Sequence, residues 1–182
     1  MKKVSIIPRG VAALGYTQQV PTEDRYVLRE SELLDRLDAS LGGRVAEEIV
    51  FGDVSTGAQN DLDQATALAR HMIVRCGMSR ALGLATFDGN DAYGGANWQR
   101  RRAMRYSEHT AELIDEEVRR MLAEAHERVR KTLDEKRPLL EKIARLLLAH
   151  EVVDHAALQA LMNESATSID AGQRRTAPSA VT

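Results

Sequence analysis

Histidines and carboxylates are the side chains of this sequence whose spacing could build a metal site. In the HExxH signature, two histidines four residues apart on a helix reach one zinc ion, and the glutamate between them activates a water molecule. None of the five histidines completes this pattern. His126 is followed by Glu127, but Arg130 stands where the second histidine is needed and would repel a cation. We therefore predict a solvated helix face at His126.

The other histidines have no partner at ligand spacing. His150 and His155 are five residues apart, which places their rings about 140° apart on a helix. Asp154, between them, is predicted to cap a new helix. His71 and His109 have no second histidine near them at all. We expect ordinary surface or interface histidines at these positions.

Motifs for nucleophiles and phosphate binding are also absent from the sequence. It contains no GxxxxGKS or GxxxxGKT phosphate loop and no GxSxG nucleophile motif. Cys76 is the only cysteine, which excludes an intrachain disulfide and a thiolate metal cluster, and we expect it in the core. With 25 basic and 27 acidic residues, the formal net charge of −2 gives no reason to expect nucleic-acid binding.

One carboxylate stands out by its place in a motif. Asp61 follows a loop and falls at the start of a predicted helix, on the side of Ala65, Leu68 and Met72, so we expect it to point inward. Two interpretations stay open. Either Asn60 caps the helix and Asp61 complements the helix dipole, or Asp61 is a buried ligand.

Glu47 and Glu48 pose a similar question on the preceding helix. Glu48 projects into a face of leucines, whereas Glu47 borders a face of mostly small residues. Acids in such places usually have partners, so a salt bridge with an arginine and a metal-related role are both open. The small-residue face would let another helix approach closely. It consists of Ala39, Gly43, Ala46 and Val50.

The elements that must position these residues are mainly helical. The chain is rich in Ala, Leu, Glu and Arg and only 4% aromatic, which is typical of a helical protein with an aliphatic core. Two short strands are predicted within residues 3–20, and core helices within residues 31–76. The inward-facing positions are Leu33, Leu34, Leu37, Leu41, Val45 and Ile49, then Leu62, Ala65, Leu68, Ala69, Met72 and Ile73.

The second half of the chain predicts a surface loop and a helical bundle. Residues 83–98 are glycine-rich and read as the loop, and residues 107–162 as three helices that begin near Ser107, Pro138 and Asp154. The first two of these helices would form a long hairpin. Their buried stripes would be Ala111, Ile114, Val118, Met121, Ala125 and Val129, then Leu139, Leu140, Ile143, Leu146 and Leu147; Leu158, Leu161 and Met162 would follow in the last helix.

The predicted architecture is therefore mainly α, with two short N-terminal strands followed by about five helices. Residues 1–164 would form one domain and residues 165–182 a disordered tail. No apolar run approaches the roughly 20 residues of a membrane-spanning helix, and the N-terminus lacks the apolar core of a signal peptide. We expect a soluble, cytoplasmic chain without direct membrane insertion.

Four motifs in order along the chain resemble the peptidase domain of the FtsH family, membrane-anchored AAA+ zinc proteases. They cover residues 4–10, 13–17, 41–52 and 55–62, and the resemblance continues to about Met162. The motifs are Val4-Ser5-Ile6-Ile7-Pro8-Arg9-Gly10, Ala13-Leu14-Gly15-Tyr16-Thr17, Leu41-Gly42-Gly43-Arg44-Val45-Ala46-Glu47-Glu48-Ile49-Val50-Phe51-Gly52 and Ser55-Thr56-Gly57-Ala58-Gln59-Asn60-Asp61-Leu62.

The resemblance implies a function and places residues in it. In that family an HExxH helix precedes the strand that resembles residues 4–8, and an aspartate is the third zinc ligand, to which Asp61 corresponds. Glu47 corresponds to an acid beside the metal that supports a zinc-bound histidine. The small-residue face would be where the HExxH helix packs. The resemblance also implies a hexamer, protein substrates, an ATPase module with ATP and magnesium, and a peptidase domain on the cytoplasmic side.

Three hypotheses follow for the chain itself. It is a C-terminal fragment of an ATP-dependent zinc metalloendopeptidase, through gene truncation, a misplaced start or deliberate shortening, and without HExxH and the ATPase module it is inactive and holds no zinc stably. Alternatively, it is a non-catalytic oligomerisation module that joins full-length protease subunits. The third hypothesis is a plain helical adaptor.

Overall fold

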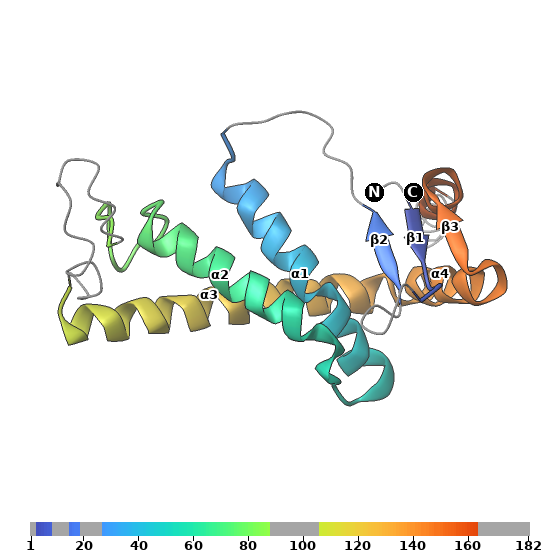
Figure 1. Ribbon diagram of the computed structural model, residues 1–182, viewed down its shortest axis with the longest axis horizontal. Helices are drawn as coiled ribbons and strands as arrows, with labels where there is room; N and C mark the ends of the chain where they lie inside the picture. The colour runs from blue at the N-terminus through green and yellow to red at the C-terminus, as the bar shows by residue number, and fades with distance from the viewer. Residues whose placement is uncertain (1–2, 9–14, 19–26, 88–105, 164–182) are drawn as a thin grey trace, which may run out of the picture. The chain divides into compact units, whose positions relative to one another are not determined.

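The computed structural model describes residues 3–8, 15–18, 27–87 and 106–163. The chain divides into two compact units, one formed by residues 26–134 and the other by residues 1–25 together with 135–182. The described residues are mainly helical and include one small sheet, which confirms the predicted fold class (Figure 1).

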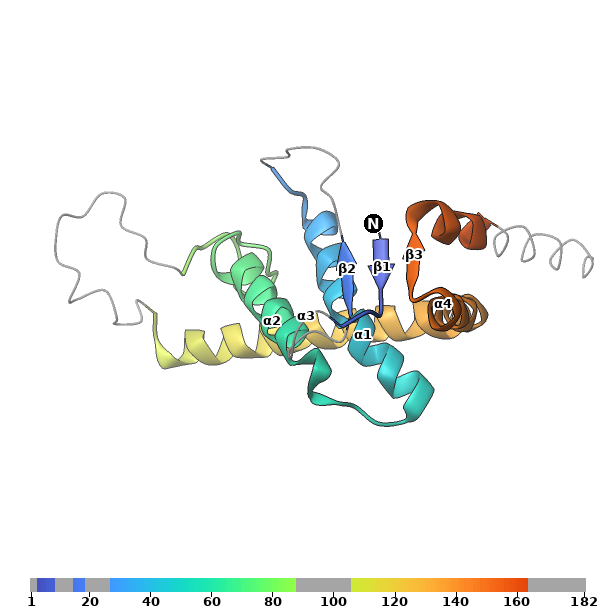
Figure 2. The same cartoon turned by 45° about the vertical axis from the view of Figure 1, so that its right-hand side comes forward.

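Three long helices build the unit of residues 26–134. These are α1 (Glu30–Phe51), α2 (Gln59–Val74) and α3 (Glu108–Glu135), of which only Glu135 is assigned to the other unit. Helices α1 and α2 both lie against α3, and the three inner faces share one aliphatic core (Figures 1 and 2). Its fully buried side chains include Leu37, Val45, Met72, Ile73 and Ile114, all on the predicted stripes.

Local signals determine where these helices begin and end. Glu32 accepts a hydrogen bond from the Arg29 backbone N–H (2.8 Å) at the start of α1. Gly52 ends α1 in the left-handed region (φ 69°), where residues with a Cβ are disfavoured, and its N–H donates to the Glu48 carbonyl. Ser107 accepts a hydrogen bond from the Thr110 N–H just before α3, as predicted.

The start of α2 differs from the prediction that Asn60 caps it. A short 3-10 helix, η1 (Thr56–Ala58), precedes α2, and Asn60 already lies inside the α-helix. The capping side chain belongs to Ser55, which accepts a hydrogen bond from the Gly57 N–H (3.1 Å). Beyond the other end of α2, Cys76 is exposed, so its predicted place in the core is wrong. The helix has already ended at Val74, and its inward face does not extend to Cys76.

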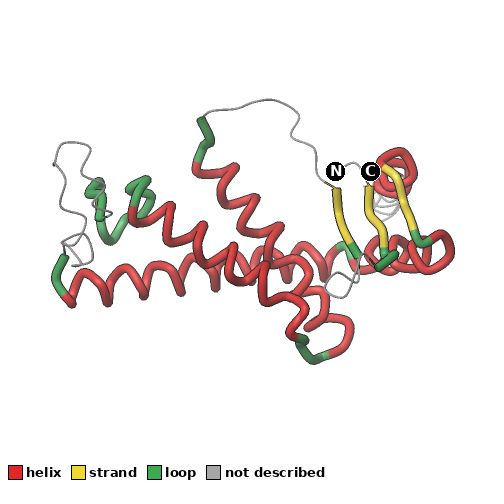
Figure 3. Tube along the Cα trace, in the orientation of Figure 1, coloured by secondary structure: helices red, strands yellow, loops and turns green. Residues whose placement is uncertain are grey.

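The second unit holds a three-stranded antiparallel sheet. Strands β1 (Lys3–Ser5) and β2 (Tyr16–Gln18) were predicted, but β3 (Val152–Asp154) was not. The order is β2-β1-β3, with Val4 opposite both Thr17 and Val153 (Figure 3). A three-residue strand carries too little periodicity to be recognised without its neighbour.

Two helices flank β3 in the sequence. Helix α4 (Arg137–His150) has Pro138 in its first turn as predicted, but its apolar stripe is only half-buried and the helix contains no buried residue. A helix at residues 155–163 follows β3, and Asp154 accepts a hydrogen bond from the Ala157 N–H (2.9 Å), which confirms the predicted cap. In that helix Leu158 is buried, whereas Met162 is exposed, contrary to prediction.

Several expectations lie outside what the structure describes. Most of the predicted loop at 83–98 falls in residues 88–105, and the predicted tail falls in residues 164–182. The predicted hairpin of α3 and α4 spans the two units and stays a prediction. Within the described ranges, no helix is both long and apolar enough to cross a membrane.

Candidate functional site

Glu47 lies near the end of α1 and binds the loop that follows the helix. Its Oε2 accepts a hydrogen bond from the Ser55 backbone N–H (2.8 Å), and its Oε1 accepts one from the Ser55 hydroxyl (2.9 Å). These two hydrogen bonds hold the pKa of Glu47 below the ordinary glutamate value, and the one from the backbone N–H has the larger effect. The charge of Arg44 acts in the same direction. Glu47 is therefore an anionic anchor for residues 55–58.

Asp61 lies in the first turn of α2, six residues after Ser55. Its side chain is exposed, which contradicts the expectation that it points inward. Leu62 and Ala65 lie on the face of α2 that packs against the core. No element in the described part of the chain covers Asp61 at the N-terminal end of this helix. The carboxylate is favourably placed for the helix dipole and has an oxygen available to a ligand.

The described residues do not by themselves make a zinc site. Among them, no three histidine, cysteine, aspartate or glutamate side chains gather closely enough to hold a metal ion. Catalytic zinc is held by three protein ligands, whereas Asp61 would offer one carboxylate, and Glu47 is engaged with Ser55. Asp61 fits zinc chemistry as a single oxygen ligand that needs further ligands from another segment.

Glu48 and His126 form a contact between α1 and α3. The His126 Nε2 and Glu48 Oε2 atoms are 2.7 Å apart, and Arg44 Nε lies 3.4 Å from the other oxygen of Glu48. The predicted bridge between an acid of this pair and an arginine is thereby confirmed for Glu48. The solvated face predicted at His126 is wrong, because α1 packs against that side and leaves the imidazole half-buried.

A buried carboxylate that the sequence analysis missed lies on α3. Glu117 is only 8% exposed and accepts hydrogen bonds from the Ser79 hydroxyl (2.7 Å) and from Arg120 (2.9 and 3.0 Å). Arg120 also binds Glu124 (2.6 Å). The sequence carried one usable signal: Glu117 falls on the apolar stripe of α3, three residues after Ile114.

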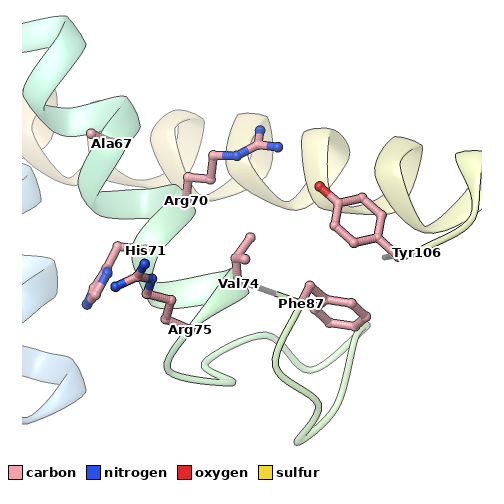
Figure 4. Close-up of a pocket in the computed structure, with 7 residues that line it drawn as sticks. All are labelled: Ala67, Arg70, His71, Val74, Arg75, Phe87 and Tyr106. Carbon is pink, nitrogen blue, oxygen red and sulfur yellow. The ribbon is translucent and has the colours of Figure 1, made fainter. Parts of the chain in front are cut away.

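A shallow pocket of about 350 Å³ lies at the C-terminal end of α2 (Figure 4). Phe87 and Tyr106 wall it with edge-to-face rings whose centroids are 5.8 Å apart. Arg70, His71 and Arg75 supply polar groups on its other side, and Arg70 also binds Asp115 (3.2 Å). Its lining includes neither Glu47 nor Asp61, so the pocket is separate from the candidate zinc ligand.

Two of the four histidines predicted as ordinary surface or interface residues are His71 and His109. His71 is exposed in the pocket of Figure 4, and His109 is exposed with its Nδ1 3.9 Å from Glu112. Neither gathers with other metal-ligating side chains among the described residues.

The sequence that forms these helices and the motif around Asp61 matches a known peptidase class. The profile of peptidase family M41 matches residues 1–161, and the chain belongs to that family. An ATP-dependent zinc metalloprotease FtsH from Burkholderia pseudomallei is 66% identical over 169 residues, which are 92% of this chain and 25% of that protein.

Two further relatives carry the same description. The FtsH of Ralstonia pickettii is 57% identical over 169 residues, 92% of this chain and 24% of its own length. That of Syntrophobacter fumaroxidans is 54% identical over 166 residues, 90% of this chain and 26% of its own length. The chain thus spans about a quarter of the length of the curated relatives it matches.

Proposed function

We propose that this chain is the C-terminal part of the peptidase domain of an ATP-dependent zinc metalloendopeptidase. The observation that carries the proposal is the match to family M41 over residues 1–161, at up to 66% identity with proteins described as zinc metalloproteases. In the intact site Asp61 is the third zinc ligand, and Glu47 supports the site without binding the metal. The two histidines and the catalytic glutamate come from an HExxH segment that this sequence does not contain.

On its own the 182-residue chain neither holds zinc stably nor cleaves peptide bonds. A lone exposed carboxylate binds a divalent cation weakly in water, because it replaces only one of the hydration contacts of the ion. Micromolar zinc is therefore expected to leave the melting temperature of the chain unchanged. Binding to the native state alone would raise the melting temperature, so this measurement detects any stable site.

The test restores the missing ligands. The chain is fused behind the HExxH-bearing segment of the Burkholderia pseudomallei relative, and zinc affinity and cleavage of fluorescent casein are measured for the fusion and for the chain alone. We expect zinc binding and cleavage only in the fusion. In the fusion, Asp61→Ala abolishes both, whereas Asp63→Ala, an exposed aspartate on the same helix, is the matched control and changes neither. Unchanged zinc affinity in Asp61→Ala would refute the assignment of Asp61.

A second candidate function is a non-catalytic module that joins full-length protease subunits. Its support is the outer face of α1, where Ala39, Gly43 and Val50 are exposed and Phe51 is 77% exposed. Apart from Gly43, its chain neighbours and the nearby backbone of its own helix, no described atom lies within 4 Å of a Cβ built on Gly43, so another helix could approach closely. Co-purification of the tagged chain with a full-length FtsH relative tests this function, and no association in that experiment would exclude it.

The intact protein is proposed to act on protein substrates as a homo-oligomer, a hexamer by its resemblance to FtsH. ATP and magnesium belong to an ATPase module outside the matched residues. The peptidase part would lie on the cytoplasmic side of a membrane to which the intact protein is anchored. Light scattering of the fusion would test the oligomeric state, with a monomer as the contradicting result.

A further inference from the structure

Ser55 is the most densely bonded residue of the connection between α1 and α2. Its N–H and its hydroxyl donate to the two oxygens of Glu47 (2.8 and 2.9 Å), and the hydroxyl accepts from the Gly57 N–H (3.1 Å). One residue therefore occupies both oxygens of the Glu47 carboxylate. The same residue caps η1, so it ties the end of α1 to the start of the next helical segment.

The segment between Ser55 and Asp61 is almost entirely helical, so it has little freedom to change conformation. Helix η1 occupies residues 56–58, α2 begins at Gln59, and Asp61 lies in its first turn. The space around the anchor is also filled: a Cβ at Gly57 would lie 3.1 Å from the Ser55 hydroxyl oxygen and 4.0 Å from Glu47 Oε1. The orientation of the first turn of α2 therefore depends on the hydrogen bonds between Glu47 and Ser55.

The carboxylate of Asp61 is not held by a neighbouring side chain in the described part of the chain. It is exposed, and no hydrogen bond or ion pair joins it to another residue in the described part of the chain. The position of such a carboxylate therefore follows from the backbone of its helix turn, which the neighbouring Ala58 and Ala65 help to hold by burial. Restraint of the backbone is therefore what preorganises it.

We propose that Ser55 is a positioning residue for Asp61: by holding the connection on the carboxylate of Glu47, it sets the place from which Asp61 offers its oxygen to the metal. The role goes beyond the support that Glu47 gives to a histidine, because here Glu47 acts on this chain's own loop. The proposal rests on the proposed function in one respect only, the assignment of Asp61 as a zinc ligand.

The first test needs no metal and uses the whole chain. Amide hydrogen exchange is compared in the wild type, Ser55→Ala, Ser55→Thr and the control Ser40→Ala, whose hydroxyl only donates to the Arg36 carbonyl on α1. We expect Ser55→Ala to accelerate exchange at residues 55–62 about tenfold, while the α1 and α2 core amides stay protected. Ser55→Thr keeps the hydroxyl and should retain protection, and Ser40→Ala should leave residues 55–62 unchanged. Unchanged protection in Ser55→Ala would overturn the proposal.

The second test asks whether the restraint reaches the metal ligand. Zinc affinity is measured in the fusion that carries the HExxH segment, with the same variants. Residues that orient a ligand typically contribute 10–100-fold in metal affinity, so we expect Ser55→Ala to weaken zinc binding about tenfold and Ser55→Thr to restore it. Faster exchange without weaker zinc binding would overturn the proposal.

The two tests also separate this inference from the proposed function. If Asp61→Ala leaves zinc affinity unchanged, the assignment of Asp61 fails and the positioning role fails with it. If Asp61→Ala abolishes zinc binding while Ser55→Ala does not weaken it, the proposed function stands and only the positioning role of Ser55 is refuted.

Discussion

Glu117 lies almost out of contact with water and keeps its charge through its donors. Arg120 supplies two hydrogen bonds and Ser79 a third, and together they hold the pKa of Glu117 below its ordinary value of 4.5 despite the opposing effect of burial. The hydroxyl of Ser79 also accepts a hydrogen bond from the Leu82 N–H (3.2 Å). The network therefore fastens the turn after α2 to α3.

Removal of the Ser79 hydroxyl should destabilise the chain. Ser79→Ala leaves a buried carboxylate short of one donor and the Leu82 N–H short of its acceptor, so we expect a loss of about 1–3 kcal/mol in the free energy of unfolding. Urea denaturation measures it. The control is Ser40→Ala on the exposed side of α1, where the change should stay within about 0.5 kcal/mol. Equal effects of the two substitutions would contradict this account.

The lowered pKa of Glu117 should also make the free energy of unfolding depend on pH in acid. Because its folded pKa is lowered, Glu117 stabilises the folded state fully above pH 4.5, and this contribution is lost as the pH falls below 4.5 through the lower folded pKa. Glu117→Gln should therefore be less stable than the wild type at neutral pH, and the difference should shrink as the pH falls below 4.5. Urea midpoints measured across this range test it, and a difference independent of pH would refute it.

At the scale of elements, α1 is the helix that joins the core to the candidate site. One face buries Leu33, Leu37, Leu41 and Val45 against α2 and α3, and its last turns present Glu47 to Ser55. A change in the packing of this face would also move the anchor of the α1–α2 connection. The core packing and the Glu47–Ser55 contact thus depend on the same helix.

Leu37 is the residue with which to test this helix. It is fully buried, so Leu37→Ala creates a cavity among close-packed side chains and should cost about 2–5 kcal/mol. Leu148→Ala on α4 makes the same change at a side chain that is 77% exposed and should cost less than about 1 kcal/mol. Thermal and urea denaturation of both variants measure the contrast, and similar losses would show that the α1 packing is wrong.

At the scale of the whole molecule, apolar burial is unequal between the two units. Residues 26–134 contain the continuous core of α1, α2 and α3. In the other unit, the buried residues among those described are Ser5, Val153 and Leu158, and α4 contributes none. Because burial of apolar surface is the main stabilising term, the two units should differ in local stability.

Native-state hydrogen exchange should reveal this difference. We expect the amides around Leu37, Met72 and Ile114 to exchange only through global unfolding. The amides of α4 should exchange faster, through local unfolding. The comparison uses one sample and needs no substitution. Protection of α4 equal to that of α1 would mean that its apolar stripe is covered by a partner, a second copy of the chain included.

Much of this protein follows from the order of its residues alone. Helical spacing located α1, α2 and α3 and their inward faces, Gly52 and Pro138 marked helix boundaries, and Asp154 was recognised as a cap. The family is also evident from the sequence, since its motifs are contiguous runs. These features depend on neighbours within a few positions, which is why a linear pattern reveals them.

Only the tertiary structure decided which polar groups meet. The bonds of Glu48 to His126 and of Glu117 to Ser79 join residues 78 and 38 positions apart, and no periodicity encodes such pairs. The exposure of Asp61 and of Cys76 likewise depends on what covers the two ends of α2, and the pairing of β3 depends on the presence of β1. Burial and hydrogen bonding are properties of the neighbours brought by the fold, whereas helical period is a property of the chain itself.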